Sequence, residues 1–276
     1  MKKTILQSKS KAVQSSLLCA AIAAALSIGS AQAGTPAKAP VVVEPKETPF
    51  VTGNITLNYD THFISYGQDV WGAGMDWGDS LFHPSIELDF AVAENLQFYV
   101  NVWADVNDLA DSNIGKYVQE VDLNVGFYYT MDKFKFQLGY GAWMYADQTE
   151  SVIDAKVSYS GFYGLNPFLA IHARPDIGDN IGLDTGLVGQ LGIAPGTTLG
   201  PVALTFPVTV SFDTDGFHGG GSGFAYVSAG VAASIPVTKH ISIGLAAIYY
   251  HTNDSVIATN PDSDFVTGTA GFTVAF

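Results

Sequence analysis

The chain has 276 residues, of which 47% are hydrophobic and only 14% are charged, and its 26 acidic residues against 12 basic ones give a formal net charge of −14. An aromatic content of 12% excludes a disordered acidic tail, and the shortage of cations excludes binding of nucleic acid through a basic face. The single cysteine, Cys19, excludes a disulfide framework and a CxxC-type metal or redox site, and we expect neither a metal nor a cofactor.

The first 33 residues have the composition of a secretory signal peptide. Four lysines precede an apolar run over 17–28, and residues 31–33 read Ala-Gln-Ala. The run is too short to span a bilayer comfortably, so we expect a cleaved leader over 1–33 rather than a membrane anchor. Residues 34–50 are rich in proline and are expected to form an extended periplasmic linker.

From residue 51 onwards, apolar residues recur at every second position in segments of about 10–15 residues, which is the periodicity of β-strands. Over 96–107, for example, the even-numbered residues are apolar, whereas the odd-numbered ones are polar or aromatic. Turn signals divide the region into twelve predicted strands: 51–66, 80–93, 96–108, 118–130, 133–147, 150–162, 166–175, 183–194, 201–213, 224–236, 240–252 and 264–276.

The connections between these segments alternate, with one exception, between tight turns and longer loops rich in Gly, Asp and Asn. An even number of antiparallel strands with this alternation is typical of transmembrane β-barrels, because closure leaves no strand edge exposed to lipid. The sequence therefore predicts an all-β, closed antiparallel barrel of twelve strands over 51–276. A secreted β-sandwich is the alternative, but the segments exceed the usual 5–6 residues of globular strands, and their apolar faces carry almost no charge.

Aromatic residues on the predicted outer face gather towards the strand ends, as in the interfacial girdles of membrane barrels. We expect one rim to carry Phe63, Phe212 and Tyr249, and the other to carry Phe98, Tyr129, Phe134 and Phe276.

The chain ends in GTAGFTVAF, which resembles the terminal signal of Gram-negative outer-membrane β-barrels. In that superfamily the barrel assembly machinery reads the last aromatic residue and the alternating apolar residues before it, which the resemblance assigns to Phe272, Val274 and Phe276. The resemblance also implies location in the cell outer membrane, with its lipids and lipopolysaccharide as partners, and we expect a monomer.

The opening VTGNITLNYDTHFISYGQDVWG resembles the first strand of TorF-type porins. The matching positions are Thr52, Gly53, Asn54, Tyr66, Gly67 and Gln68. The sequence departs from that pattern by having HFISYG where an arginine-bearing turn is expected.

If the apolar faces contact lipid, the opposite positions line the lumen. The expected lumen acids are Asp60, Glu87, Asp89, Asp105, Glu120, Asp122, Asp147, Asp154, Asp184 and Asp213. The expected basic residues are Lys133, Lys135, Lys156 and Arg174, and the large ones are Tyr99, Trp103, Tyr128, Trp143 and Tyr145. An acidic lumen concentrates cations and repels anions, which favours a small neutral or cationic solute.

The sequence therefore predicts a porin-like outer-membrane channel for passive diffusion of small solutes, not an enzyme. A non-conducting structural or adhesion barrel that presents extracellular loops is the first alternative. An outer-membrane lipase is the second, although no spacing places a serine, a histidine and a third group together on one lipid-facing side. Two questions stay open: whether the lumen is closed by its own side chains, and whether loop 67–79, with Trp71 and Trp77, folds inward as a constriction.

Overall fold

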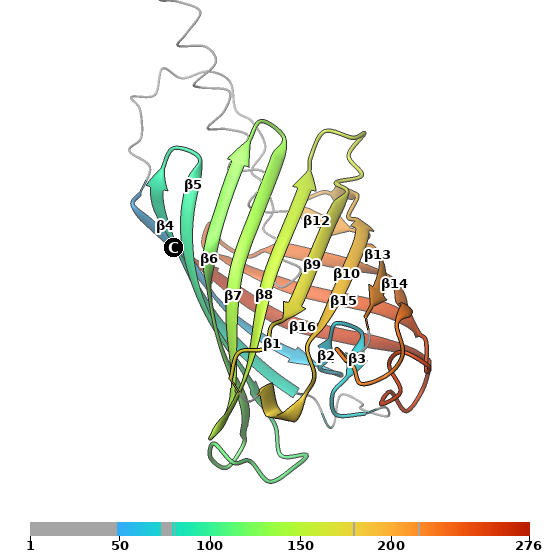
Figure 1. Cartoon of the computed structure of the whole chain (residues 1–276). Coiled ribbons are helices and arrows are strands. Elements are labelled where there is room, and N and C mark those ends of the chain that lie inside the picture. Colours follow the sequence, from blue (N-terminus) through green and yellow to red (C-terminus); the bar gives the residue numbers. More distant parts are fainter. Residues whose placement is uncertain (1–48, 73–78, 80, 179, 215) are drawn as a thin grey trace, which may run out of the picture.

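The computed structural model describes residues 49–72, 79, 81–178, 180–214 and 216–276 (Figure 1). The predicted leader and the predicted linker as far as residue 48 lie outside the described residues, and so do 73–78. Among the described residues, no helix is long and apolar enough to cross a bilayer.

The structure is a single antiparallel sheet that closes on itself (Figure 1). The strands of the wall are β1 (Val51–Asp60), β4 (Leu81–Ala93), β5 (Leu96–Val106), β6 (Val118–Met131), β7 (Phe134–Tyr145), β8 (Gln148–Tyr159), β9 (Phe168–Arg174), β10 (Gly186–Ile193), β13 (Val208–Asp213), β14 (Gly223–Pro236), β15 (Ile241–Thr252) and β16 (Asp264–Ala275). Each pairs with the next one along the chain, and β16 pairs with β1. The prediction of a closed barrel of twelve strands is confirmed.

Two further strands of the sheet lie outside this circuit. β11 (Gly196–Leu199) and β12 (Val202–Thr205) form a hairpin between β10 and β13, and β12 pairs with the end of β14. The predicted strand 201–213 is therefore divided in two. Pro207, just before β13, has no N–H to donate to a neighbouring strand, which suits a break at this point.

Two other predicted strands were too long. The predicted strand 51–66 leaves the barrel wall after Asp60, and its last residues enter a small hairpin made of β2 (Ile64–Ser65) and β3 (Gln68–Asp69). The predicted strand 183–194 begins only at Gly186, because the chain before it forms the short 3-10 turn η1 (Asn180–Gly182) and an irregular segment.

The connections separate into a short-turn end and a long-loop end. β4 joins β5, and β6 joins β7, through two-residue turns at the end where the C-terminus lies (Figure 1). The opposite end carries the longer connections, whose described residues are 61–72, 79, 107–117, 175–178, 180–185, 214, 216–222 and 253–263, with one tight turn, 146–147, among them. This is the predicted arrangement of connections, and the extracellular side of the long loops stays a prediction.

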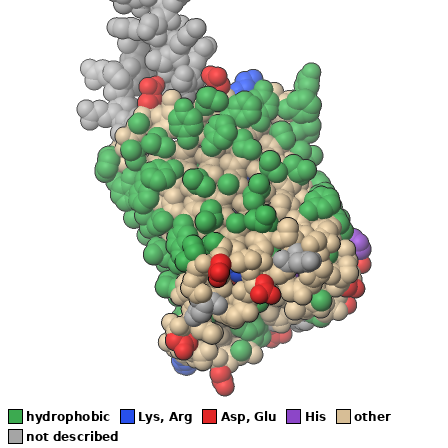
Figure 2. All heavy atoms as spheres, viewed as in Figure 1, with side chains coloured by type: hydrophobic (Ala, Val, Ile, Leu, Met, Phe, Trp, Pro, Cys, Tyr) green, Lys and Arg blue, Asp and Glu red, His purple; other side chains and the backbone are tan. Residues whose placement is uncertain are grey.

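The outer wall is apolar along its height. Outward side chains such as Leu123, Leu138 and Leu245 are exposed although they belong to central parts of strands. Figure 2 shows hydrophobic side chains spread over the wall, with charged groups gathered towards the two ends in this view. A surface of this kind is unfavourable in water and matches the hydrocarbon core of a bilayer.

Aromatic rings form a girdle near the short-turn end. Ring centroids lie 6.1 Å apart for Phe90 and Phe98, and 5.4 Å apart for Phe98 and Phe127. The girdle continues through Tyr129, Phe134 and Phe136, and Phe276 is 54% exposed. At the long-loop end Phe212 and Tyr249 are exposed on the outside, as predicted. The prediction for Phe63 is wrong, since its ring lies 5.0 Å from that of Trp103.

We predict that Leu138→Arg destabilises the barrel by about 2–4 kcal/mol, because a lipid-facing cation near the bilayer midplane has this cost in membrane barrels. Denaturant unfolding of the barrel in phospholipid vesicles measures the effect. Leu199→Arg is the matched control, since Leu199 is 71% exposed in the hairpin outside the wall. An equal loss in both variants would contradict the assignment of Leu138 to lipid.

Candidate functional site

The connection after β1 folds into the barrel instead of outward from it. We call residues 61–71, which include β2 and β3, the inward hairpin. At its tip the Tyr66 ring stacks on Trp143 with 5.8 Å between centroids and lies 4.2 Å from His172. The Tyr66 hydroxyl donates to Asp154 at 3.4 Å. The tip therefore contacts the side of the barrel formed by β7, β8 and β9.

Gly67 allows the tip to approach the opposite side. Its φ of 97° lies in the left-handed region, and a Cβ atom there would stand 2.3 Å from the Tyr226 ring. No side chain fits at this distance, so glycine is required both by the turn and by the contact. The hairpin therefore spans the lumen from β7 to β14.

Two long-loop residues, Asn260 and His218, and one wall residue, Asp105, hold the hairpin in place. Asn260 accepts a hydrogen bond from the Asp69 N–H at 2.8 Å and donates to the Gly67 carbonyl at 2.9 Å. His218 Nε2 lies 3.4 Å from the Ser65 carbonyl oxygen. Trp71 donates through Nε1 to Asp105 Oδ2 at 2.7 Å. The inward fold thus begins at residue 61 and includes Trp71, whereas Trp77 of the predicted loop 67–79 lies outside the described residues.

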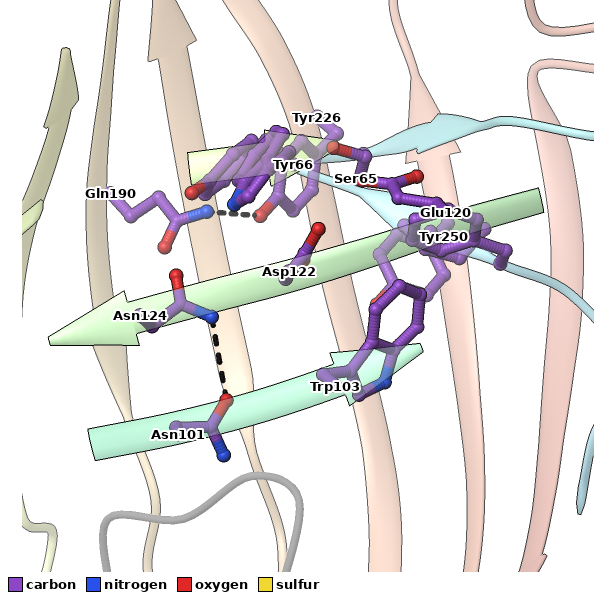
Figure 3. Close-up of a pocket in the computed structure, with 14 residues that line it drawn as sticks. Ser65, Tyr66, Asn101, Trp103, Glu120, Asp122, Asn124, Gln190, Tyr226 and Tyr250 are labelled. Carbon is purple, nitrogen blue, oxygen red and sulfur yellow. Dashed lines mark hydrogen bonds between the residues drawn. The ribbon is translucent and has the colours of Figure 1, made fainter. Parts of the chain in front are cut away.

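Two cavities flank the inward hairpin. The first, which we call the acid–aromatic cavity, has a volume of about 410 Å³ and is shown in Figure 3. Its lining consists of Phe63, Ile64, Ser65, Tyr66, Gly67, Asn101, Trp103, Glu120, Asp122, Asn124, Trp143, Gln190, Tyr226 and Tyr250. Figure 3 shows Asp122 and Asn124 rising from β6 into the space that Tyr66, Trp103 and Gln190 border.

The second cavity, which we call the hydroxyl-lined cavity, has a volume of about 520 Å³. Small residues and hydroxyl-bearing residues of β15 and β16 form much of its wall, among them Ser242, Gly244, Thr267, Gly271 and Thr273. Phe63, Ile64, Asn101, Trp103 and Tyr250 border both cavities. The two spaces therefore adjoin at the inward hairpin.

A group of polar side chains fixes Asp105 in the wall. His83 lies between two carboxylates, with Nδ1 2.7 Å from Asp60 Oδ2 and Nε2 3.2 Å from Asp105 Oδ1. Asp105 also accepts a hydrogen bond from Asn107 Nδ2 at 2.9 Å and is fully buried. Asp105 lines neither cavity, so its carboxylate holds the hairpin and the wall together.

A buried ion pair links β8 to the long loops. Arg174 NH2 lies 2.5 Å from Glu150 Oε1, and Arg174 NH1 donates to the Phe217 carbonyl at 2.7 Å. Glu150 is absent from the predicted lumen residues. It lies on the same face of β8 as Asp154 and Lys156, so the alternation that selected those two residues could have found it.

Further charged groups occupy the short-turn half of the lumen. Lys135 lies over the Tyr128 ring at 3.8 Å, and Tyr128 stacks on Tyr99 at 4.5 Å. Lys156 lies over the Phe168 ring at 4.4 Å. Two further predicted lumen acids, Glu87 and Asp89, lie on the same face of β4 as Ser85. Ser85 lines the hydroxyl-lined cavity.

Two predicted acids pair with histidines. Asp154 Oδ1 lies 2.5 Å from His172 Nδ1, and Asp213 Oδ2 lies 2.5 Å from His218 Nδ1. The alternation of apolar and polar residues gives no signal of which carboxylate a histidine contacts, so the sequence did not predict these pairs.

Three predicted lumen residues lie outside the lumen. Lys133 is exposed in the turn between β6 and β7, and Asp147 is exposed in the turn between β7 and β8. Asp184 is exposed in the loop before β10, where its carbonyl oxygen accepts a hydrogen bond from Arg174. These predictions are wrong because the strands are shorter than the alternation indicated: β7 covers only Phe134–Tyr145, and β10 begins only at Gly186.

The residues predicted to form the assembly signal occupy the outward face of the last strand. Phe272 is exposed to the outside, and the backbone of Phe276 exchanges two hydrogen bonds of 3.0 Å with Gly53. Recognition of Phe272, Val274 and Phe276 by the assembly machinery stays a prediction.

One histidine–carboxylate pair faces outward at the long-loop rim. His251 Nδ1 lies 3.0 Å from Asp264 Oδ1, and the Tyr249 hydroxyl donates to the same oxygen. Within the described ranges, no hydrogen bond joins a serine hydroxyl to His251, and no cluster of three or more His, Cys, Asp or Glu residues is arranged to hold a metal ion.

No family model and no curated protein matches the sequence. Among solved structures, an outer-membrane channel from Pseudomonas putida F1 is similar with a TM-score of 0.50 and 10% identity, over 85% of this chain and 100% of that chain. This similarity shows the fold, a closed antiparallel β-barrel of the kind found in that outer-membrane channel.

Two other solved structures are similar to this barrel. The NanC porin has a TM-score of 0.48 and 8% identity, over 80% of this chain and 98% of that chain. Outer membrane phospholipase A from Escherichia coli has a TM-score of 0.43 and 13% identity, over 81% of this chain and 92% of that chain. With no matching family, the resemblance to TorF-type porins stays a prediction.

We predict that Asn260→Ala releases the inward hairpin. The variant leaves the Asp69 N–H and the Gly67 carbonyl unpaired, at about 1–3 kcal/mol for each buried group left unsatisfied. Chymotrypsin should then cleave after Tyr66 several-fold faster in the folded barrel. Asn113→Ala, in an exposed loop, is the control. Equal cleavage rates in both variants would show that Asn260 does not hold the hairpin.

We predict that the hairpin docks more tightly at pH 5 than at pH 8. Burial raises the pKa of Asp69 from 3.8 to about 7, although the N–H groups of Trp71 and Gly72 oppose part of this shift. Docking favours the protonated carboxyl, so this stabilisation is complete below about pH 4 and is lost as the pH rises to about 7.

A fluorophore on Ser65→Cys, exposed to an aqueous quencher at both pH values, measures this docking. His62 Nε2 lies 3.8 Å from Asp69, and burial lowers the pKa of His62, so its own contribution has the opposite sign. Asp69→Asn should abolish the increase in quenching at pH 8. Persistence of that increase in the variant would assign it to another group.

Proposed function

We propose that this outer-membrane barrel is a channel for the passive diffusion of small solutes and that its lumen favours cations. The observation that carries the proposal is the lining of the acid–aromatic cavity. Glu120 and Asp122 are the charged residues in that lining, which includes no lysine or arginine. A low-dielectric wall around fixed negative charges concentrates cations and repels anions.

The basic residues of the described lumen do not offset these carboxylates directly. Arg174 is paired with Glu150, and Lys135 and Lys156 lie over aromatic rings towards the short-turn end. The inward hairpin narrows the same region, so a solute that crosses the barrel passes close to Glu120 and Asp122. Size and charge are then selected at one level of the channel.

A non-conducting barrel is the second candidate, and the hairpin itself favours it. Contacts with Asn260, His218 and Asp105 fix the hairpin across the lumen. A barrel that stays closed in this way would present its long loops as a structural or adhesive surface. Electrical recording separates the two candidates.

We further propose that the barrel is not a lipase and acts as a monomer in outer-membrane lipid and lipopolysaccharide. The outward His251–Asp264 pair lacks a serine partner among the described residues, which leaves no nucleophile activated by that histidine.

We predict that the refolded barrel gives discrete conductance steps in a planar bilayer and that its reversal potential in a salt gradient favours cations. Glu120→Gln combined with Asp122→Asn should move the reversal potential towards zero, because the fixed charge of the narrow region is lost. Asp132→Asn combined with Asp147→Asn removes two exposed turn carboxylates and should leave it unchanged. A folded barrel without steps would overturn the channel, and an anion preference would overturn the charge assignment.

A further inference from the structure

The acid–aromatic cavity combines two carboxylates with several aromatic rings. Trp103 and Tyr250 border it on one side, and Tyr66 borders it on another (Figure 3). Trp143 also belongs to its lining. Tyr66 and Trp143 stack with an interplanar angle of 21°. Aromatic faces attract cations, most strongly where water is excluded, and they attract alkylated ammonium groups in particular.

The carboxylates of this cavity are not neutralised by protein cations in the described part of the chain. Asp122 Oδ1 is shielded from solvent and accepts no hydrogen bond there, whereas Glu120 Oε1 accepts one from the Tyr145 hydroxyl at 2.9 Å. A buried carboxylate oxygen without a partner is unfavourable. A bound cation would supply a positive charge next to this carboxylate oxygen.

Neutral polar groups complete the lining. Asn124 Nδ2 donates to Asn101 Oδ1 at 3.4 Å, and Gln190 Nε2 donates to the Tyr226 hydroxyl at 2.8 Å. These groups retain free donors and acceptors for a hydroxyl or carbonyl of a ligand. The volume of about 410 Å³ lies in the range of sites for small organic molecules, roughly 300–1,000 Å³.

We propose that the acid–aromatic cavity is a binding site for small organic cations that carry an alkylated ammonium group. The rings surround the alkyl groups, and Asp122 and Glu120 balance the charge. A bare divalent metal ion is the less favoured occupant, because such an ion requires about six oxygen ligands and much of this lining is aromatic. The inference rests on the proposed function and specifies the solute class of the same lumen.

Isothermal titration of the refolded barrel in detergent with choline tests the proposal. The matched ligand is 3,3-dimethylbutan-1-ol, which has the same shape and no charge. Choline should bind at least about tenfold more tightly than the alcohol, since only choline gains from the rings and the carboxylates together. Calcium chloride serves as the metal probe. Equal affinities of choline and the alcohol, or tighter binding of calcium than of choline, would overturn the proposal.

Variants locate the site. Asp122→Asn should weaken choline binding about tenfold or more, whereas Asp132→Asn, which removes an exposed turn carboxylate, should not. Tyr250→Leu removes a ring and should also weaken binding, whereas Tyr250→Phe keeps the ring and should not. Unchanged binding in both Asp122→Asn and Tyr250→Leu would overturn the assignment. If Asp122→Asn does not fold, as judged by gel mobility without heating, the Tyr250 pair decides.

The failure of this inference is distinguishable from the failure of the proposed function. Titration in detergent does not depend on conduction, and the bilayer recording with potassium chloride does not depend on choline. If the barrel conducts but binds choline and the alcohol equally, the channel proposal stands and the cation-site proposal fails. If the barrel gives no conductance steps but binds choline, the cation-site proposal stands and the channel proposal fails.

Discussion

Backbone hydrogen bonding in a solvent without donors or acceptors is the constraint on which this structure depends. A strand edge exposed to lipid would leave several N–H and C=O groups unpaired, so the sheet must close. Closure is completed where β16 pairs with β1 and where Phe276 and Gly53 exchange hydrogen bonds. A closed sheet has only two faces, and the alternation along each strand therefore divides the chain into residues for lipid and residues for the lumen.

The lumen then becomes the place where every inward charge must find water or a partner. Some acids meet this requirement within the chain, as Asp60 and Asp105 do with His83, and Glu150 does with Arg174. Glu120 and Asp122 meet it less completely. The difference between these groups separates the acids that hold the barrel together from the acids that are available to a solute.

Local pattern predicted the wall because each strand repeats the same two-residue period, and strand neighbours in the barrel are sequence neighbours. The same pattern failed at the inward hairpin. Residues 61–66 follow β1 without a strong turn signal, and the groups that hold the inward hairpin, Asn260, His218 and Trp143, lie far away in the sequence. The exposed positions of Lys133 and Asp184 have a related cause, since alternation does not mark where a strand begins.

The inward hairpin is common to the proposed channel and the proposed cation site. Phe63 and Tyr66 belong to the hairpin, and they also border the acid–aromatic cavity. If the hairpin leaves the lumen, the pore widens and the cavity loses two of its rings, while Glu120 and Asp122 remain on β6. A cation held between the rings and the carboxylates would in turn stabilise the docked hairpin, because a ligand stabilises the conformation to which it binds. If both proposals hold, solute binding and the width of the channel are coupled through residues 61–71, and a solute that binds tightly slows its own passage.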